Sequence, residues 1–333
     1  PQFFPKYQNK LYVINGIDTT TGNHDTGTRV IWSGQVADGF PSFAAVVAAA
    51  KTPNNPLAFI SNGGYESTGG LTSLTRLGNV DTVQNIAYAN RIQANDPART
   101  FHSSATWDRI NMMQRERLDD MTRRQSLPRL SRSTSALYLA RSADNTLPML
   151  AAALPTQAQI NAATNDLHRQ ALVALAGFKT GLAVSASIST GGFDTHGNHD
   201  GAHQPLMCNL LYGLDMIMTE ITNQGLDGKV VVCVGSDFGR TPGYNAQNGK
   251  DHWNITSMLF MGAGIPGGKL VGASDDSFRA TTVNPSTLAP DASGTRIRCE
   301  HIQTALRKLA GVSDSDAARK FPIPATETMP LFT

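Results

Sequence analysis

A chain of 333 residues is long enough to bury a large core, as one big α/β domain or two smaller ones. Because 40% of its residues are hydrophobic and only 16% are charged, the disordered and fibrous classes are excluded. The net charge is only +2 and no basic stripe is interleaved with aromatics, so we expect no nucleic-acid partner. No apolar stretch approaches the ~20 residues that cross a bilayer, so no membrane span is predicted.

Short apolar runs closed by Gly, Ser, Asn or Asp predict buried parallel strands, and longer segments with 3.6-residue apolar spacing predict helices. The strands are expected at 11–14, 57–60, 182–188, 230–234 and 258–261, and the helices at 42–50, 105–122, 157–178, 206–223 and 300–309. This alternation predicts a doubly wound, mostly parallel sheet flanked by helices. We expect a single domain over 1–333, with a helical insertion at 100–155 and a long surface loop at 275–295.

The first candidate site directly follows the strand at 182–188. Asp194, His196, His199 and Asp200 lie within seven residues, behind a pair of glycines. Carboxylate oxygen and neutral imidazole nitrogen are ligands of Zn²⁺, Mn²⁺ or iron, and glycines let the backbone approach an ion. A metal site is predicted here, and the alternative is a solvated polar loop.

Two further clusters follow the strand at 230–234. Asp237 lies just beyond that strand, with Arg240 three residues on, a pair suited to binding a cation and an anionic substrate oxygen. The alternative is a helix-capping Asp with a surface Arg. Asp251 and His252 follow after a Gly/Asn-rich loop. His252 can complete a metal coordination shell if it returns to the same sheet edge.

A fourth cluster follows the first predicted strand and consists of three threonines and then Asn23 and His24. Hydroxyl groups at a strand-to-helix junction usually cap the helix. They can equally present a nucleophile to a metal, with helix N–H groups facing the developing oxyanion.

At these four places the chain resembles the bacterial family named domain of unknown function 1501, a branch of the alkaline phosphatase-like superfamily. The motifs that carry the resemblance run along nearly the whole chain. They are Asn23-His24-Asp25, Trp32-Ser33-Gly34, Asn62-Gly63-Gly64, Leu127-Pro128-Arg129, Gly192-Phe193-Asp194-Thr195-His196, Phe238-Gly239-Arg240-Thr241-Pro242, Asp251-His252-Trp253, and Gly262-Ala263-Gly264 through Val271-Gly272-Ala273.

The resemblance implies a central sheet with one or two divalent metal ions (Zn, Mn or Ca) at its C-terminal edge. By position, Asp194, His196 and His252 would bind the first metal and Asp237 the second. The family's acid and His are usually separated by three residues and here by one, so His199 is an alternative to His196. The superfamily's first strand should precede Leu11, and it is expected to be missing from this chain.

The activity that the resemblance implies is hydrolysis or transfer of phosphoric or sulfuric esters. Thr20 would be the nucleophile, with Thr21 and Thr19 as fallbacks, because the run from Thr20 to His24 looks like the Thr-x-x-Asn-His run of nucleotide pyrophosphatases. Arg240, Asn23 or His24 would contact the non-bridging oxygens.

The resemblance also implies export to the periplasm or the outside, with a small phosphate or sulfate ester as substrate. A second hypothesis is a catalytically inactive fold that serves as a binding or structural subunit of a cell-surface assembly, with other chains of that assembly as partners.

Overall fold

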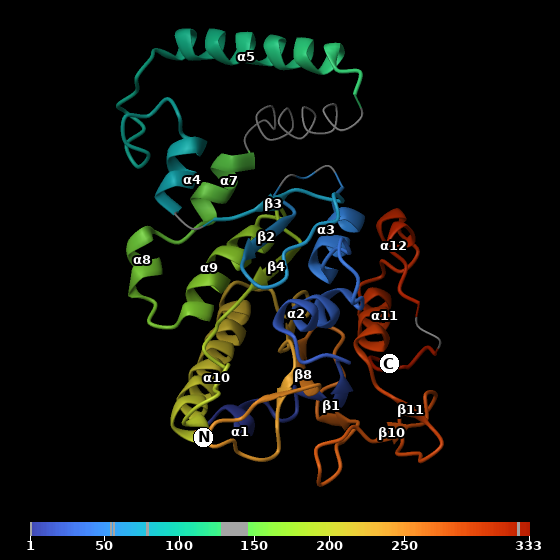
Figure 1. Cartoon of the computed structure of the whole chain (residues 1–333). Coiled ribbons are helices and arrows are strands. Elements are labelled where there is room, and N and C mark those ends of the chain that lie inside the picture. Colours follow the sequence, from blue (N-terminus) through green and yellow to red (C-terminus); the bar gives the residue numbers. More distant parts are fainter. Residues whose placement is uncertain (1, 54, 56, 78–79, 128–145, 325–326) are drawn as a thin grey trace.

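The computed structural model describes residues 2–53, 55, 57–77, 80–127, 146–324 and 327–333. Their fold is α/β, with helices packed around small sheets (Figure 1). The main sheet is made of β1 (Tyr12–Asp18), β5 (Val231–Val234), β8 (Ile255–Gly262) and β9 (Lys269–Val271). Its strand order is β5-β8-β1-β9.

Alternating side chains of β1 bury against helices on both faces of the main sheet. Tyr12 and Ile14 join the core cluster of α2 (His24–Ser33) and α11 (Cys299–Leu309), whereas Val13 packs on the opposite face. That face is covered by α9 (Asp166–Lys179) and α10 (His199–Asn223), with the short α1 (Phe3–Tyr7) beside them. Helices therefore flank the sheet on two sides (Figure 1).

A second sheet has the order β3-β2-β4, and all of its strands are parallel. Its strands are β2 (Phe59–Asn62), β3 (Leu74–Thr75) and β4 (Ser185–Ile188). The helices α3 (Phe43–Lys51) and α9 pack against β2 and β4.

The expectation of one mostly parallel sheet is wrong for the described residues, in which the sheets are small and the main one is mixed. The strand predicted at 258–261 lies in β8, which runs antiparallel to both β1 and β5. Parallel neighbours need a crossover connection, usually a helix. The segment between β5 and β8 holds only the ribbon of β6 (Gly239–Arg240) and β7 (His252–Trp253), so the chain returns antiparallel.

Each predicted helix has a counterpart, but the one expected at 157–178 is two helices, α8 (Gln157–Ala162) and α9. The break occurs because the side chain of Asn165 accepts a hydrogen bond from the backbone of His168 and caps a new helix. The remaining helices of the described ranges are α4 (Val80–Ala87), α5 (Ser104–Arg124), α7 (Thr146–Ala153) and α12 (Asp316–Lys320).

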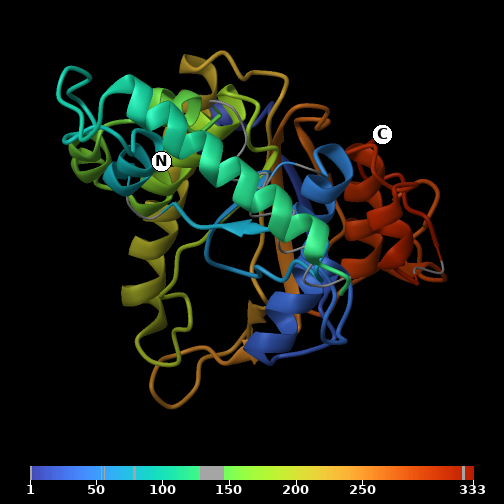
Figure 2. The same cartoon turned by 90° about the horizontal axis from the view of Figure 1, so that it is seen from above.

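The insertion expected at 100–155 contains α5, which crosses above the rest of the chain (Figure 2). Residues 128–145 of that insertion, including the motif residues Pro128 and Arg129, lie outside the described residues. The loop expected at 275–295 contains β10 (Thr282–Val283), which pairs with β11 (Thr295–Arg296). Within the described ranges, no helix is long and apolar enough to cross a membrane.

Candidate metal centre

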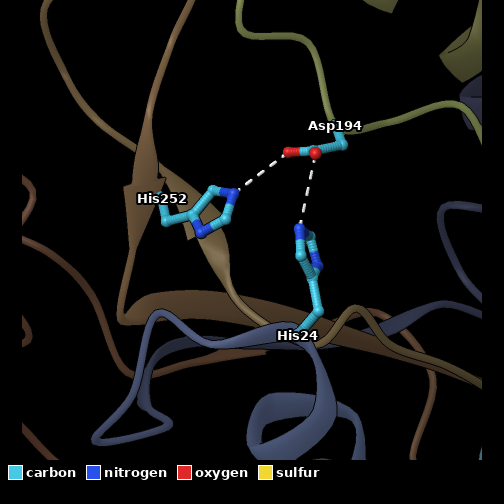
Figure 3. Close-up of side chains that lie close together, drawn as sticks. All are labelled: His24, Asp194 and His252. Carbon is cyan, nitrogen blue, oxygen red and sulfur yellow. Dashed lines mark hydrogen bonds and ion pairs between the residues drawn. The ribbon is translucent and has the colours of Figure 1, made fainter.

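Three segments that are far apart in the sequence bring ionisable side chains together. His24 begins α2, Asp194 lies in the loop after β4, and His252 begins β7. Their ligand atoms all lie within 4.8 Å of one another, and Figure 3 shows both imidazoles turned toward the carboxylate. A carboxylate with two imidazoles is a donor set for a divalent metal ion.

The carboxylate of Asp194 is the centre of this cluster. Its Oδ1 lies 3.1 Å from Nε2 of His252 and 3.0 Å from Nε2 of His196. Its Oδ2 lies 3.4 Å from Nε2 of His24. The two Nε2 atoms of His196 and His252 are themselves only 2.9 Å apart. The structure therefore adds His196 to the cluster, as the sequence predicts.

The other ring nitrogen of each histidine faces a hydrogen-bond acceptor. Nδ1 of His24 lies 2.5 Å from Oδ2 of Asp237, and Nδ1 of His196 lies 2.9 Å from Oδ1 of Asp251. Nδ1 of His252 lies 2.6 Å from a backbone carbonyl in the loop before α2. Since ionised carboxylates and carbonyls only accept, each Nδ1 can donate its proton to its partner and leave Nε2 free to bind a metal ion.

Close packing holds His24 beside Asp237. A Cβ added to Gly27, in the first turn of α2, would stand 2.6 Å from the carbonyl oxygen of Asp237, so only glycine allows this approach. Asn23 caps α2, because its side chain accepts a hydrogen bond from the backbone N–H of Thr26. The buried ring of Phe238 packs against the ring of His24 at a centroid distance of 4.8 Å.

Arg240 also reaches Asp194. Arg240 and His252 are directly paired across the β6–β7 ribbon, so both extend toward the same loop. One guanidinium nitrogen forms an ion pair with Oδ1 of Asp194, and the other donates a 3.2 Å hydrogen bond to the carbonyl oxygen of Lys250. The guanidinium thus contacts the carboxylate, whereas the sequence motif predicts a contact with substrate oxygens.

The pKa of Asp194 reflects these opposing influences. Burial raises the pKa, but hydrogen bonds from Arg240 and His252 and the charges of Arg240 and His196 lower it overall. The carboxyl group is therefore ionised throughout the neutral range, as a metal ligand must be.

The three candidate nucleophiles lie in different surroundings. Thr19 is buried and its hydroxyl donates to the carbonyl oxygens of Thr21 and Asn254, at 3.0 and 2.9 Å. The hydroxyl of Thr21 accepts from the backbone N–H of Asn23 at 3.1 Å. Thr20 is exposed and has a φ of 59°, a left-handed conformation that is rare for a β-branched residue. Of the three residues, Thr20 is thus the most exposed.

His199 lies apart from the cluster, at the start of α10. Its Nδ1 is 2.6 Å from the hydroxyl of Thr195, and its ring stacks on that of His203 at a centroid distance of 4.5 Å. Burial, with the nearby charges of Lys250 and Arg240, lowers its pKa. The structure thus brings His196, and not His199, to Asp194.

Sequence reasoning gave no role to three residues next to the site. Asp251 accepts from both His196 and Asn245, whose side chain also donates to the backbone carbonyl of His196. The buried Asp18 ends β1 and accepts from the backbone N–H of Thr20 at 2.9 Å. The position of Asp251 directly before His252, and of Asp18 at a strand end, was the available signal.

Comparison with known proteins places the chain in a family but brings no characterised relative. No curated protein matches it. Residues 2–295, which are most of the chain, match the sequence pattern of one family. The chain therefore belongs to the family described as "Protein of unknown function (DUF1501)".

Proposed function

We propose that this protein is a metal-dependent hydrolase of phosphoric or sulfuric esters, with Asp194, His252, His24 and His196 as ligands of one or two divalent ions. The observation that carries the proposal is the meeting of three Nε2 atoms around one carboxylate. At 2.9 Å, the Nε2 atoms of His196 and His252 need a proton or a cation between them.

The spacing of these atoms also fits a single metal ion. Oδ1 of Asp194 and the Nε2 atoms of His196 and His252 form a triangle with edges of 2.9 to 3.1 Å. Ligand atoms bound at about 2.1 Å to one ion stand roughly 2.9–3.4 Å apart in octahedral or tetrahedral geometry. The acceptors behind each Nδ1 also match the carboxylate and carbonyl partners that orient metal-binding histidines.

In this proposal Asp237 has a different place from the one expected from the sequence. Its Oδ2 is hydrogen-bonded to Nδ1 of His24, and its Oδ1 accepts from the backbone N–H of Phe238 at 3.0 Å. Asp237 therefore orients a ligand of the first ion. A second ion at Asp237 would have to replace the bond to His24.

Thr20 is the proposed nucleophile. It lies three residues before Asn23, the cap of α2, and the first N–H groups of that helix could donate to an ester bound nearby. Strained left-handed residues cluster at active sites, where the fold holds a reactive group in place. A bound divalent ion supplies charge stabilisation to the transferred group. Asn23 keeps its amide N–H₂ for a substrate oxygen, because its Oδ1 caps the helix.

Membership of the alkaline phosphatase-like superfamily is part of the proposal. Asp18 ends β1, Asp237 lies beyond the end of β5, and Asp194 lies in the loop after β4, which agrees with the placing of ligands at strand ends. Export to the periplasm or the outside is proposed on the sequence resemblance alone.

Two measurements test the proposal. Elemental analysis of the purified protein should find one or two equivalents of Zn, Mn or Ca, and the Asp194→Ala, His252→Ala double variant should lose them. The metal-loaded protein should hydrolyse an aryl phosphate or aryl sulfate. Thr20→Ala should lower that rate by orders of magnitude, whereas Thr20→Ser should retain part of it.

Thr21→Ala is the matched control, because Thr21 is a neighbouring hydroxyl already in a local hydrogen bond. If Thr21→Ala abolishes turnover and Thr20→Ala does not, the nucleophile is wrongly assigned. No bound metal in a folded wild-type protein would reject the proposal. That result would favour the inactive binding or structural subunit.

A further inference from the structure

The guanidinium of Arg240 lies beside Asp194, where a positive charge is needed to balance the carboxylate. Its guanidinium contacts Oδ1 of Asp194, the same oxygen that faces the Nε2 atoms of His196 and His252. Only 13% of the Arg240 side chain is exposed. One carboxylate oxygen is thus shared by the guanidinium and by both imidazoles that would bind a metal.

Two cations cannot both contact that oxygen without mutual repulsion. A divalent ion and a guanidinium about 5 Å apart repel even in water-like surroundings, and the effect on an equilibrium constant is on the order of tenfold. Binding of a divalent ion at Asp194 would therefore weaken the ion pair with Arg240. The hydrogen bond from Nη1 of Arg240 to the Lys250 carbonyl oxygen would still keep the guanidinium near the site.

A guanidinium freed in this way is suited to a tetrahedral oxyanion. Its planar fork can donate two parallel hydrogen bonds to two oxygens of a phosphate or sulfate. Arg240 is paired with His252 across the ribbon, so it stays beside a proposed metal ligand while it turns from the carboxylate to the anion.

We infer that Arg240 is a stand-in cation on Asp194, which a divalent metal ion displaces and which then binds the substrate oxyanion. This inference rests on the proposed function and specifies its regulation: metal and oxyanion bind with positive coupling, and the metal-free site binds oxyanions poorly. It also fixes a sign. Removal of the Arg240 charge should strengthen metal binding, whereas loss of a merely structural arginine would weaken it.

The test is calorimetric titration of Zn²⁺ into metal-free wild type and Arg240→Gln, with folding checked by thermal unfolding. Arg240→Gln should bind Zn²⁺ on the order of tenfold more tightly. The control is Arg76→Gln, which removes the same charge from an exposed ion pair with Glu66 at the other sheet. It should leave the Zn²⁺ affinity unchanged. Equal or weaker Zn²⁺ binding by a folded Arg240→Gln variant would overturn the inference.

Inorganic phosphate and sulfate are then titrated into metal-free and Zn²⁺-loaded protein. Wild type should bind at least one of them more tightly when loaded, and Arg240→Gln should lose most of that gain. Arg240→Lys keeps the charge, so it should bind Zn²⁺ like wild type but show a smaller gain. If Arg240→Gln fails to fold, Arg240→Lys serves as the test variant. A Zn²⁺-dependent gain in phosphate or sulfate affinity as large as that of wild type would then contradict the inference.

Failure of the proposed function has a different signature. In that case wild type itself binds no divalent metal, and the inference falls with the proposal. If wild type binds Zn²⁺ but phosphate and sulfate affinities do not depend on it, the coupling is wrong and the metal site stands.

Discussion

Gly249 offers the sharpest structural test of the metal centre, because it touches the backbone of a proposed ligand. A Cβ at this position would lie 1.9 Å from the carbonyl oxygen of His196, whereas real Cβ contacts stay above 3.0 Å. In Gly249→Ala the two segments must therefore separate by about 1.1 Å. The atoms that the added Cβ would meet all belong to the backbone, so no flexible side chain can move aside to relieve the clash.

The loop that must move carries Asp251 and His252, two and three residues further on. Its displacement should pull His252 away from Asp194 and reduce Zn²⁺ affinity by roughly tenfold to a hundredfold, the range expected when a site is misplaced by ~1 Å or loses an orienting partner. The strain should also lower the free energy of unfolding by about 1–3 kcal/mol.

The assay is Zn²⁺ titration of wild type, Gly249→Ala and Gly243→Ala. Gly243 lies in the same loop, but a Cβ there would meet nothing within 4 Å, so Gly243→Ala should bind as wild type does. If a folded Gly249→Ala protein binds Zn²⁺ with wild-type affinity, the contact between this loop and His196 does not position the metal ligands.

Three further predictions concern other residues. Asp251→Asn should weaken Zn²⁺ binding roughly tenfold, because the carboxylate that orients His196 is lost, and unchanged affinity in the same titration would remove Asp251 from the site. Thr20→Gly should abolish turnover yet leave the urea midpoint equal or higher, because relief of about 1–2 kcal/mol of left-handed strain offsets the extra backbone entropy of glycine; a clearly lower midpoint would mean that Thr20 stabilises its loop. Burial raises the pKa of Tyr12 to about 12, above its unfolded value near 10, so this contribution to stability is complete below pH 10 and is lost between pH 10 and 12, at up to about 1.4 kcal/mol per pH unit. Tyr12→Phe should flatten that alkaline decline in urea-unfolding experiments at several pH values, and an unaltered decline would assign it to other groups.

Periodicity in the sequence predicted most elements but not how the strands pair. The apolar run at 258–261 identified a buried strand correctly, yet its direction depends on what connects it to β5. The Gly/Asn-rich connection gave no sign of the β6–β7 ribbon, since each strand of that ribbon is only two residues long. Strand direction was therefore predicted from the alternation of strands and helices along the chain, and this prediction is wrong for β8.

The cluster was predictable in outline because acid and imidazole residues followed strand ends. That reasoning brought Asp194, His196 and His252 together, as the structure does. It could not distinguish a residue that faces Asp194 from one that orients its neighbour, because this depends on which ring nitrogen faces which acceptor. Two expected roles therefore differ from the structure. His24, expected to contact substrate oxygens, faces Asp194, and Asp237, expected to bind the second metal, is hydrogen-bonded to His24.

The contacts of His24 and His252 have a consequence for the folding of the whole chain. His24 meets Asp194 across about half the length of the chain, and His252 meets Asp194 across 58 residues. An ion that joined these segments would close very long loops. Unlike a disulfide, it would leave the chain on unfolding, so its binding free energy would stabilise the native state alone. Bound metal at a hundred times its dissociation constant would add about 2.7 kcal/mol to the unfolding free energy. The melting temperature would then report the metal supply in the protein's surroundings.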